Sequence, residues 1–129
     1  MEAVIVIAQR DIMPELRIRL ASLAPLAGSE GALVIQDERT RVYLSRDDRV
    51  IDELEPDRRE RITGKMPSPI FYTVDFSDIE LCRKVLFLIA DDPTLLVDND
   101  HGTLLRGPEF LELLRSQPAW DWRITHPRC

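Results

Sequence analysis

The chain has 129 residues, of which 44% are hydrophobic and 31% charged, and its formal net charge is −6 at pH 7. This composition is typical of one globular domain that can bury a core, and the acidic balance disfavours nucleic acid as a partner because acidic surfaces repel phosphates. The longest apolar runs, residues 3–8 and 85–90, have six residues each, far short of the roughly 20 residues that a membrane-spanning helix needs.

Targeting and redox signals are also scarce. Glu2 follows Met1, so the basic region of a signal peptide is missing, and the chain has two cysteines, Cys82 and Cys129. Cys82 falls in an apolar helical pattern, which disfavours a structural disulfide. We therefore expect a cytoplasmic protein.

The first half predicts a strand, a helix, a two-stranded hairpin and further helix. The run at residues 3–8 is apolar and rich in β-branched residues, which indicates a strand buried on both faces. Leucines at helical spacing predict a helix between Asp11 and Pro25. Residues 32–35 and 41–44 predict the hairpin. Residues 50–54 and a charged segment opened by Pro56 predict the closing helices, and their acids Asp52, Glu53 and Glu55 fit favourable positions near helix N-termini.

The second half predicts the same order. A strand at residues 70–75 precedes a capping-box pattern from Ser77 to Glu80 and an apolar helix over residues 79–89. A second hairpin spans residues 94–97 and 103–106, and a last helix opens at Gly107. Residues 119–123 then alternate in the manner of a strand.

This recurrence predicts the fold class. The chain is expected to form a single domain over residues 1–129, built from two β-α-β-β-α repeats at about residues 3–64 and 69–117 and a Trp-containing C-terminal segment, residues 118–129. A helix between two strands favours parallel neighbours, and each hairpin adds an antiparallel strand. We therefore predict an α+β fold with a mixed β-sheet, helices packed on one face, and pseudo-twofold symmetry between the repeats.

The turn between the strands of the second hairpin is the most polar candidate site. Asp98, Asp100 and Glu109 match part of a calcium-loop spacing, but Thr103 stands where that loop requires glycine, so no metal site is predicted. A hairpin turn explains the same residues, because Asn, Asp and Gly favour tight reversals. His101 could act as a general base if Asp98 or Asp100 oriented it.

Trp120 and Trp122 are the second candidate. Alternation along a strand would place both indoles on the same side. They would then close one end of the core, or form an exposed aromatic pair on a binding surface. The predicted binding residues are thus Asp98, Asp100, His101, Trp120 and Trp122. No catalytic set and no cofactor are predicted.

Three functions fit these observations. The first is a non-enzymatic, cytoplasmic protein-binding module, for example an immunity-type inhibitor whose acidic surface plugs the basic cleft of a toxin. The second is a small-molecule-sensing regulatory domain with a site at the seam between the repeats. The third is a hydrolase-like enzyme that uses His101 with Asp98 or Asp100. An exposed strand edge would also permit a homodimer.

Overall fold

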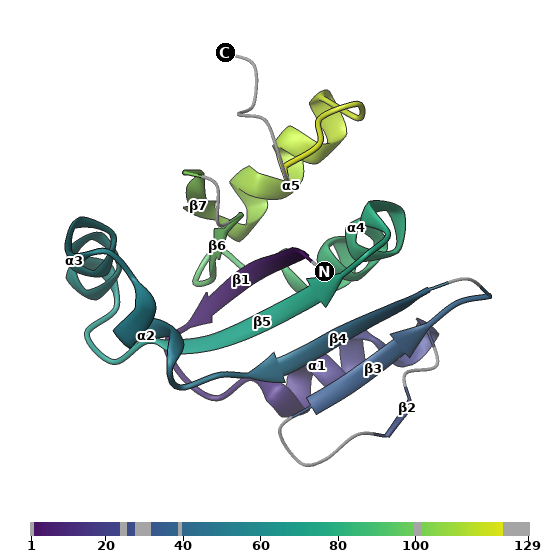
Figure 1. Cartoon of the computed structure of the whole chain (residues 1–129), viewed down its shortest axis with the longest axis horizontal. Helices are drawn as coiled ribbons and strands as arrows, with labels where there is room; N and C mark the ends of the chain where they lie inside the picture. Colours follow the sequence, from purple (N-terminus) through teal and green to yellow (C-terminus); the bar gives the residue numbers. More distant parts are fainter. Residues whose placement is uncertain (1, 24–25, 28–31, 39, 100–101, 123–129) are drawn as a thin grey trace.

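The computed structural model of the chain describes residues 2–23, 26–27, 32–38, 40–99 and 102–122, and it has an α+β fold (Figure 1). Six strands form an antiparallel sheet, and the two-residue strand β2 extends one edge, in the order β2-β3-β4-β5-β1-β6-β7. The strands are β1 (Glu2–Ala8), β2 (Leu26–Ala27), β3 (Ala32–Gln36), β4 (Arg41–Arg46), β5 (Ile70–Phe76), β6 (Leu96–Asp98) and β7 (Leu104–Arg106). The helices are α1 (Met13–Arg19), the 3-10 helix η1 (Ala21–Leu23), α2 (Val50–Glu53), α3 (Pro56–Lys65), α4 (Ile79–Ile89) and α5 (Gly107–Ser116).

The two long strands β1 and β5 form the centre of the sheet. Val4 and Val6 of β1 face one core cluster, whereas Ile5 and Ile7 face another. All four side chains are buried, as expected of a strand covered on both faces. The predicted burial of the first strand is thereby confirmed.

Helices cover both faces of the sheet, but unequally. The larger cluster packs β-strand side chains against α1, α4 and α5, and includes Leu16, Leu86 and Phe110. The smaller cluster packs the opposite face against Val50 of α2 and Ile62 of α3. The prediction that the helices lie on one face is therefore wrong for α2 and α3. The reason is that β1, β5 and β6 also present apolar side chains to the second face, and these require cover.

The sheet is antiparallel where a mixed sheet was predicted. Every strand pairing within the described residues is antiparallel. Strands β5 and β6, which α4 connects, do run in the same direction, because each is antiparallel to β1. They are not neighbours, since β1 lies between them and forms hydrogen bonds with both.

Neither the predicted internal repeat nor the predicted pseudo-twofold symmetry is confirmed, because the arrangement of the elements differs between the halves. The first hairpin joins the sheet centre through its second strand, β4, which pairs with β5. The second hairpin joins through its first strand, β6, which pairs with β1. In addition, α3 and α5 occupy opposite faces of the sheet.

Helix α4 is the best-buried helix, as its apolar pattern predicts. Its buried side chains are Leu81, Cys82, Val85, Leu86 and Ile89. The N-cap is Asp78, whose carboxylate accepts a hydrogen bond from the Glu80 backbone N–H at 2.9 Å, so the predicted capping role of Ser77 belongs to the next residue. None of the helices in the described part of the chain is long and apolar enough to cross a membrane.

Candidate functional site

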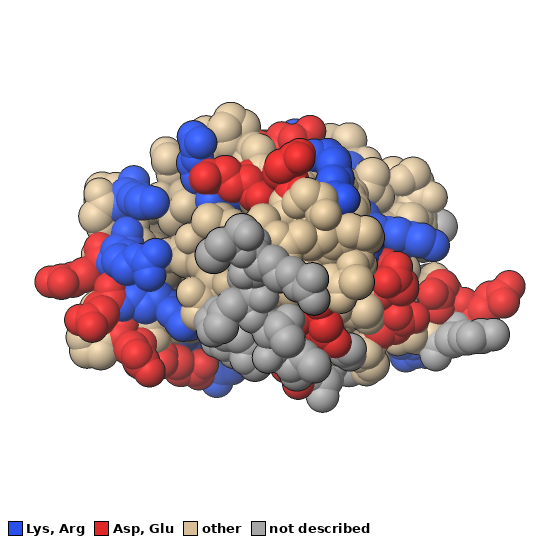
Figure 2. All heavy atoms as spheres, turned by 90° about the horizontal axis from the view of Figure 1, so that it is seen from above, with Lys and Arg blue, Asp and Glu red and all other residues tan. Residues whose placement is uncertain are grey.

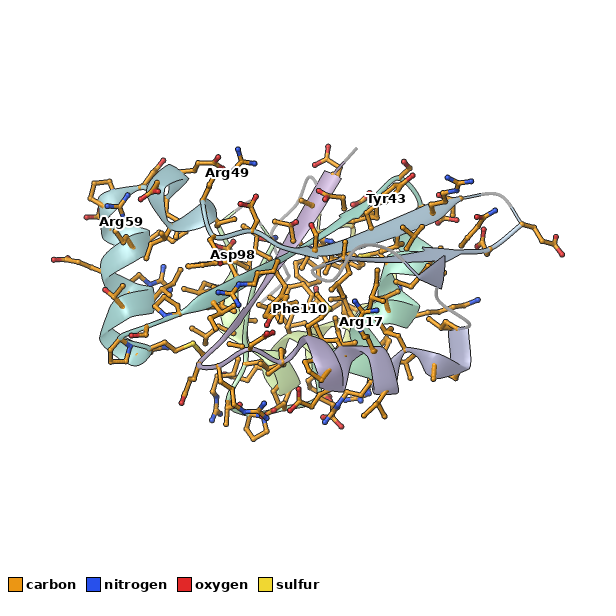
Figure 3. The ribbon with its side chains drawn as sticks, turned by 90° about the horizontal axis from the view of Figure 1, so that it is seen from below. Arg17, Tyr43, Arg49, Arg59, Asp98 and Phe110 are labelled. Carbon is orange, nitrogen blue, oxygen red and sulfur yellow. The ribbon has the colours of Figure 1, made fainter. Side chains whose placement is uncertain are left out.

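Helices α2 and α3 cover only part of their face of the sheet. We call the remaining part the open face; it consists of Ala3, Val34, Tyr43, Ser45, Thr73 and Asp75. The strand registers place Val34, Tyr43, Asp75 and Ala3 in one row across β3, β4, β5 and β1. All six residues are partly exposed. Figure 3 shows Tyr43 on the side of the sheet opposite Phe110, which belongs to the helix-covered core.

A second row runs parallel to the first and is closer to α2. It contains Ser45, Thr73, Ile5 and Asp98 on four consecutive strands. The Ser45 and Thr73 hydroxyl oxygens are 3.2 Å apart and share a hydrogen bond. This row forms the boundary between the open face and the region that α2 and α3 cover.

A cleft of about 460 Å³ opens at this boundary. We call it the acidic cleft. Its volume falls in the range of roughly 300–1,000 Å³ that is typical of ligand sites. The residues that line it come from β1, β5, α2, α3 and the segments beside these helices: Ala3, Ile5, Asp47, Val50, Glu53, Leu54, Glu55, Arg58 and Thr73.

Three carboxylates belong to this lining. Asp47 accepts a hydrogen bond from the Arg49 backbone N–H at 3.0 Å, and the Arg49 side chain lies 3.6 Å away. Glu53 and Glu55 are exposed, and within the described part of the chain neither forms an ion pair or a side-chain hydrogen bond. The charge that the cleft presents is therefore mainly negative.

The one cationic side chain in the lining, Arg58, is already engaged. Its guanidinium lies 3.4 Å from the carboxylate of Asp98, whose side chain is 1% exposed, whereas that of Arg58 is 25% exposed. A buried carboxylate in an ion pair neutralises much of the arginine's charge. Arg59, the next residue of α3, lies on the outer side of the helix in Figure 3. Figure 2 shows basic and acidic side chains close together at one end of the molecule.

The pKa of Asp75, on the open face, also reflects the negative charge of this region. Partial burial raises the pKa of its carboxyl group, and the negative charge of Asp47 raises it further. Both causes disfavour the ionised form. A positive charge on this face would offset the repulsion between Asp47 and Asp75.

The structure places the predicted site residue Asp98 in the interior. It ends β6 and faces Arg58, so it is a buried strand residue in an ion pair, whereas a place in the hairpin turn was expected. Glu109, which shares the partial calcium spacing, pairs with Arg106 at 2.9 Å. Asp100 and His101 lie outside the described residues. Of the residues in the predicted His101 site, Asp98 is thus the one that the structure describes, and its carboxylate faces an arginine.

Trp120 and Trp122 belong to the main core. Their side chains are buried, and the Phe110 ring centroid is 5.5 Å from that of Trp120 and 6.2 Å from that of Trp122. The segment is a turn and coil, and the predicted strand at residues 119–123 is not seen in its described part. Both indoles are therefore core residues, and the buried rings do not form an exposed aromatic surface.

Hydrogen bonds hold this tryptophan segment in place. The Asn99 side-chain amide donates to the Trp122 carbonyl oxygen at 3.1 Å, and its oxygen accepts from the Thr103 backbone N–H at 2.9 Å. Arg83 of α4 donates to the carbonyl oxygens of Leu114 and Pro118 at 3.2 and 3.1 Å. Its guanidinium also lies 5.7 Å from the Trp122 ring centroid, within reach of a cation–π interaction.

A second cleft, of about 340 Å³, lies where β1 ends, beside Gln9, Arg10 and Asp92. Close to it, the Tyr72 hydroxyl donates to Asp11 at 2.7 Å and accepts from the Ile12 backbone N–H at 2.8 Å. Burial and the Asp11 hydrogen bond raise the pKa of Tyr72 to about 12. This network explains how α1 begins, because Asp11 also accepts from the Met13 N–H at 3.0 Å, and it suggests no reaction.

Sequence reasoning missed the acidic cleft, although it noted the acids that form its rim. The cluster Asp52, Glu53 and Glu55 was attributed to helix N-termini. The structure agrees with that position, since Glu53 lies in the first turn of α2 and Glu55 is the N-cap residue of α3, without a side-chain cap hydrogen bond. The missing information was the packing of α2 against the second face of the sheet.

Comparison of the chain with protein-family models, with curated proteins and with solved structures finds no significant match.

Proposed function

We propose that the protein is a non-enzymatic binding module that recognises a protein partner with a basic surface, and that the partner contacts the open face and the acidic cleft. The observation that carries this proposal is the cleft itself: Glu53 and Glu55 stand unpaired, within the described residues, at the mouth of a cavity of about 460 Å³. Carboxylates without internal partners favour fast and specific association with a positively charged surface.

The open face supports the same proposal. Its row of Val34, Tyr43 and Ala3 offers partly exposed apolar surface beside the carboxylate of Asp75. Interfaces commonly combine such an apolar centre, in which Tyr is enriched, with charged groups at the rim. In its most specific form, the proposal is an immunity-type inhibitor that blocks the basic active cleft of a toxin.

The test is capture of the partner from the source cell at physiological salt, with the wild type, the variant Glu53→Lys/Glu55→Lys, and the control Glu38→Lys/Asp91→Lys. Glu38 and Asp91 are exposed and lie outside the cleft lining, so the control changes the net charge equally. We expect a basic protein that the wild type and the control retain and that the cleft variant loses. Higher salt should weaken the same complex, because screening reduces attraction between exposed charges.

Two results would reject the proposal: the absence of a partner, or equal retention by both variants. The immunity-type form makes a further prediction for any partner that is found. Expression of the partner alone should be toxic, and its co-expression with this chain should be harmless. If the partner alone is harmless, the immunity-type form is rejected, but the proposal of a protein-binding module stands.

A small-molecule sensor is the second candidate, and one observation favours it. The cleft is lined by Ala3 and Ile5 from the first half of the chain and by Thr73 from the second, so it lies at the seam where β1 pairs with β5. A ligand bound there should raise the melting temperature by mass action. A thermal-shift screen with small organic cations tests this alternative, and the Glu53→Lys/Glu55→Lys variant should abolish any shift.

A further inference from the structure

We propose that the acidic cleft receives a single arginine or lysine side chain of the partner, with its hydrocarbon stem inside the cleft and its charged head at Glu53 and Glu55. This inference rests on the proposed function, because it specifies which group of a basic partner enters the site. It follows from the way apolar and charged residues are distributed over the lining.

Three apolar side chains, Ile5, Val50 and Leu54, take part in the lining of the cleft. Ile5 and Val50 are buried, with 7% and 4% of their surface exposed, and Leu54 is half-buried beside them. Two of the three carboxylates in the lining, by contrast, are on exposed residues, Glu53 of α2 and Glu55 just before α3. Arginine and lysine bury their methylene groups against apolar surface and keep the charge at its edge, which matches this arrangement.

Other occupants fit less well. An apolar ligand would leave the rim carboxylates without a counter-charge and would dehydrate them at a cost. A bare metal ion would need several converging ligands, and the described residues contain no group of three or more His, Cys, Asp or Glu side chains that could hold one.

The buried pair of Arg58 and Asp98 keeps the cleft open to an external cation. Because the Arg58 guanidinium lies 3.4 Å from the Asp98 carboxylate, this arginine already has an acidic partner within the protein. Thr73, which also lines the cleft, adds a hydroxyl oxygen that can accept a hydrogen bond from a guanidinium or ammonium group. Asp98 is thus a positioning residue, and Glu53 and Glu55 are the binding residues.

The experiment is an NMR titration of the ¹⁵N-labelled protein with four blocked tripeptides, acetyl-Gly-X-Gly-amide. X is arginine or lysine, or one of the uncharged counterparts citrulline and norleucine. We expect saturable amide shifts at Ile5, Val50 and Thr73 with a basic peptide and none at the same concentrations with its neutral counterpart. In the variant Glu53→Gln/Glu55→Gln, the affinity should fall by about tenfold or more, the effect of losing one charge-assisted hydrogen bond. The control Glu38→Gln/Asp91→Asn should bind as the wild type does.

Three results would overturn the inference: no saturable shift with either basic peptide, equal shifts with the neutral peptides, or shifts centred away from the cleft. Its failure can be told apart from that of the proposed function. Suppose that the wild type captures a partner which the Glu53→Lys/Glu55→Lys variant does not capture, but that no peptide causes a shift. The proposed binding module would then stand, and only the binding of a single side chain in the cleft would be rejected. If a basic peptide binds but no partner is captured, the binding module would be rejected and the cleft would remain a site for a basic side chain.

Discussion

Gly107 is the residue where β7 changes directly into α5. Its backbone N–H donates to the Leu95 carbonyl oxygen at 2.9 Å, and a Cβ atom at this position would overlap the Ala90 carbonyl oxygen. Because backbone atoms cannot move aside as a flexible side chain can, any larger residue must displace the start of α5.

We therefore expect Gly107→Ala to lower the free energy of unfolding by about 1–3 kcal/mol, as overpacked sites do. Gly64 provides a matched control, because a Cβ there meets no atom within 4 Å and the residue lies inside α3. Gly64→Ala should raise the stability by up to about 1 kcal/mol through helix propensity. Urea unfolding measures both changes, and equal effects of the two substitutions would contradict the packing argument.

Asp75 gives a pH dependence that can be worked out from its raised pKa. In the folded protein, burial and Asp47 hold the pKa of this carboxyl above its ordinary value of 3.8. Between these two pKa values the folded state binds more protons than the unfolded state, so this group makes the protein less stable as the pH rises through that window. Above the pKa of Asp75 in the folded protein, the full unfavourable contribution of this charge to the free energy of unfolding is present.

The variant Asp75→Asn removes this charge and keeps the shape of the side chain. We expect it to be more stable than the wild type at pH 7, with an advantage that shrinks toward pH 4 as the wild-type carboxyl group gains its proton. Urea unfolding of both proteins at the two pH values is the measurement. A variant that is less stable at pH 7 would show that the Asp75 charge has a favourable partner.

Among the elements, α3 is attached to the sheet by one apolar and one ionic contact. Ile62 is its only buried side chain, and Arg58 pairs with Asp98 at the end of β6. The two residues are 40 positions apart in the sequence. Because the partners differ in exposure, at 25% for Arg58 and 1% for Asp98, their removal should have unequal effects.

Loss of the arginine should be the more harmful change. Arg58→Met takes away the counter-charge of a buried carboxylate, and breaking such a pair costs about 3–5 kcal/mol. Asp98→Asn should cost less, because Arg58 can turn its charged end toward the cleft and solvent. The double variant should be more stable than Arg58→Met alone. Urea unfolding of the three variants completes the cycle, and additive losses would mean that the two residues do not interact.

Sequence patterns predict some elements of this fold correctly and others wrongly. The apolar periodicity around Leu81, Val85 and Leu86 predicts α4 and its burial, and the structure confirms both. Alternation around Trp120 and Trp122 predicts a strand, and this prediction is wrong, because both indoles pack on Phe110 from a turn. Periodicity reports that neighbouring side chains share an environment, but two bulky rings can reach one core without a regular backbone.

At the scale of the whole molecule, the two halves are interlocked. The hairpin of β3 and β4 from the first half pairs with β5 of the second, and β6 of the second half pairs with β1 of the first. Each half thus completes its sheet with a strand of the other, and the main core contains side chains from both.

This arrangement predicts that neither half folds alone. A fragment ending at residue 66 keeps the β3–β4 pair but lacks β5, the second partner of β4, and both strands that pair with β1, so β1 has no neighbour and the hairpin loses its contact with the sheet centre. We expect it to lack a cooperative unfolding transition by circular dichroism, whereas the full chain unfolds in one transition. A cooperatively folded fragment would show that the halves are separate units.

The sequence by itself determined the positions of the main strands and helices, because these depend on local periodicity and turn residues. Only the tertiary structure decided the antiparallel order of the strands, the face that α2 and α3 cover, and the burial of Asp98. These features depend on contacts between residues far apart in the chain, such as Asp98 with Arg58, and no local pattern encodes them. The acidic cleft belongs to this second group, since Ile5, Glu53 and Thr73 meet only when α2 packs beside the paired strands β1 and β5.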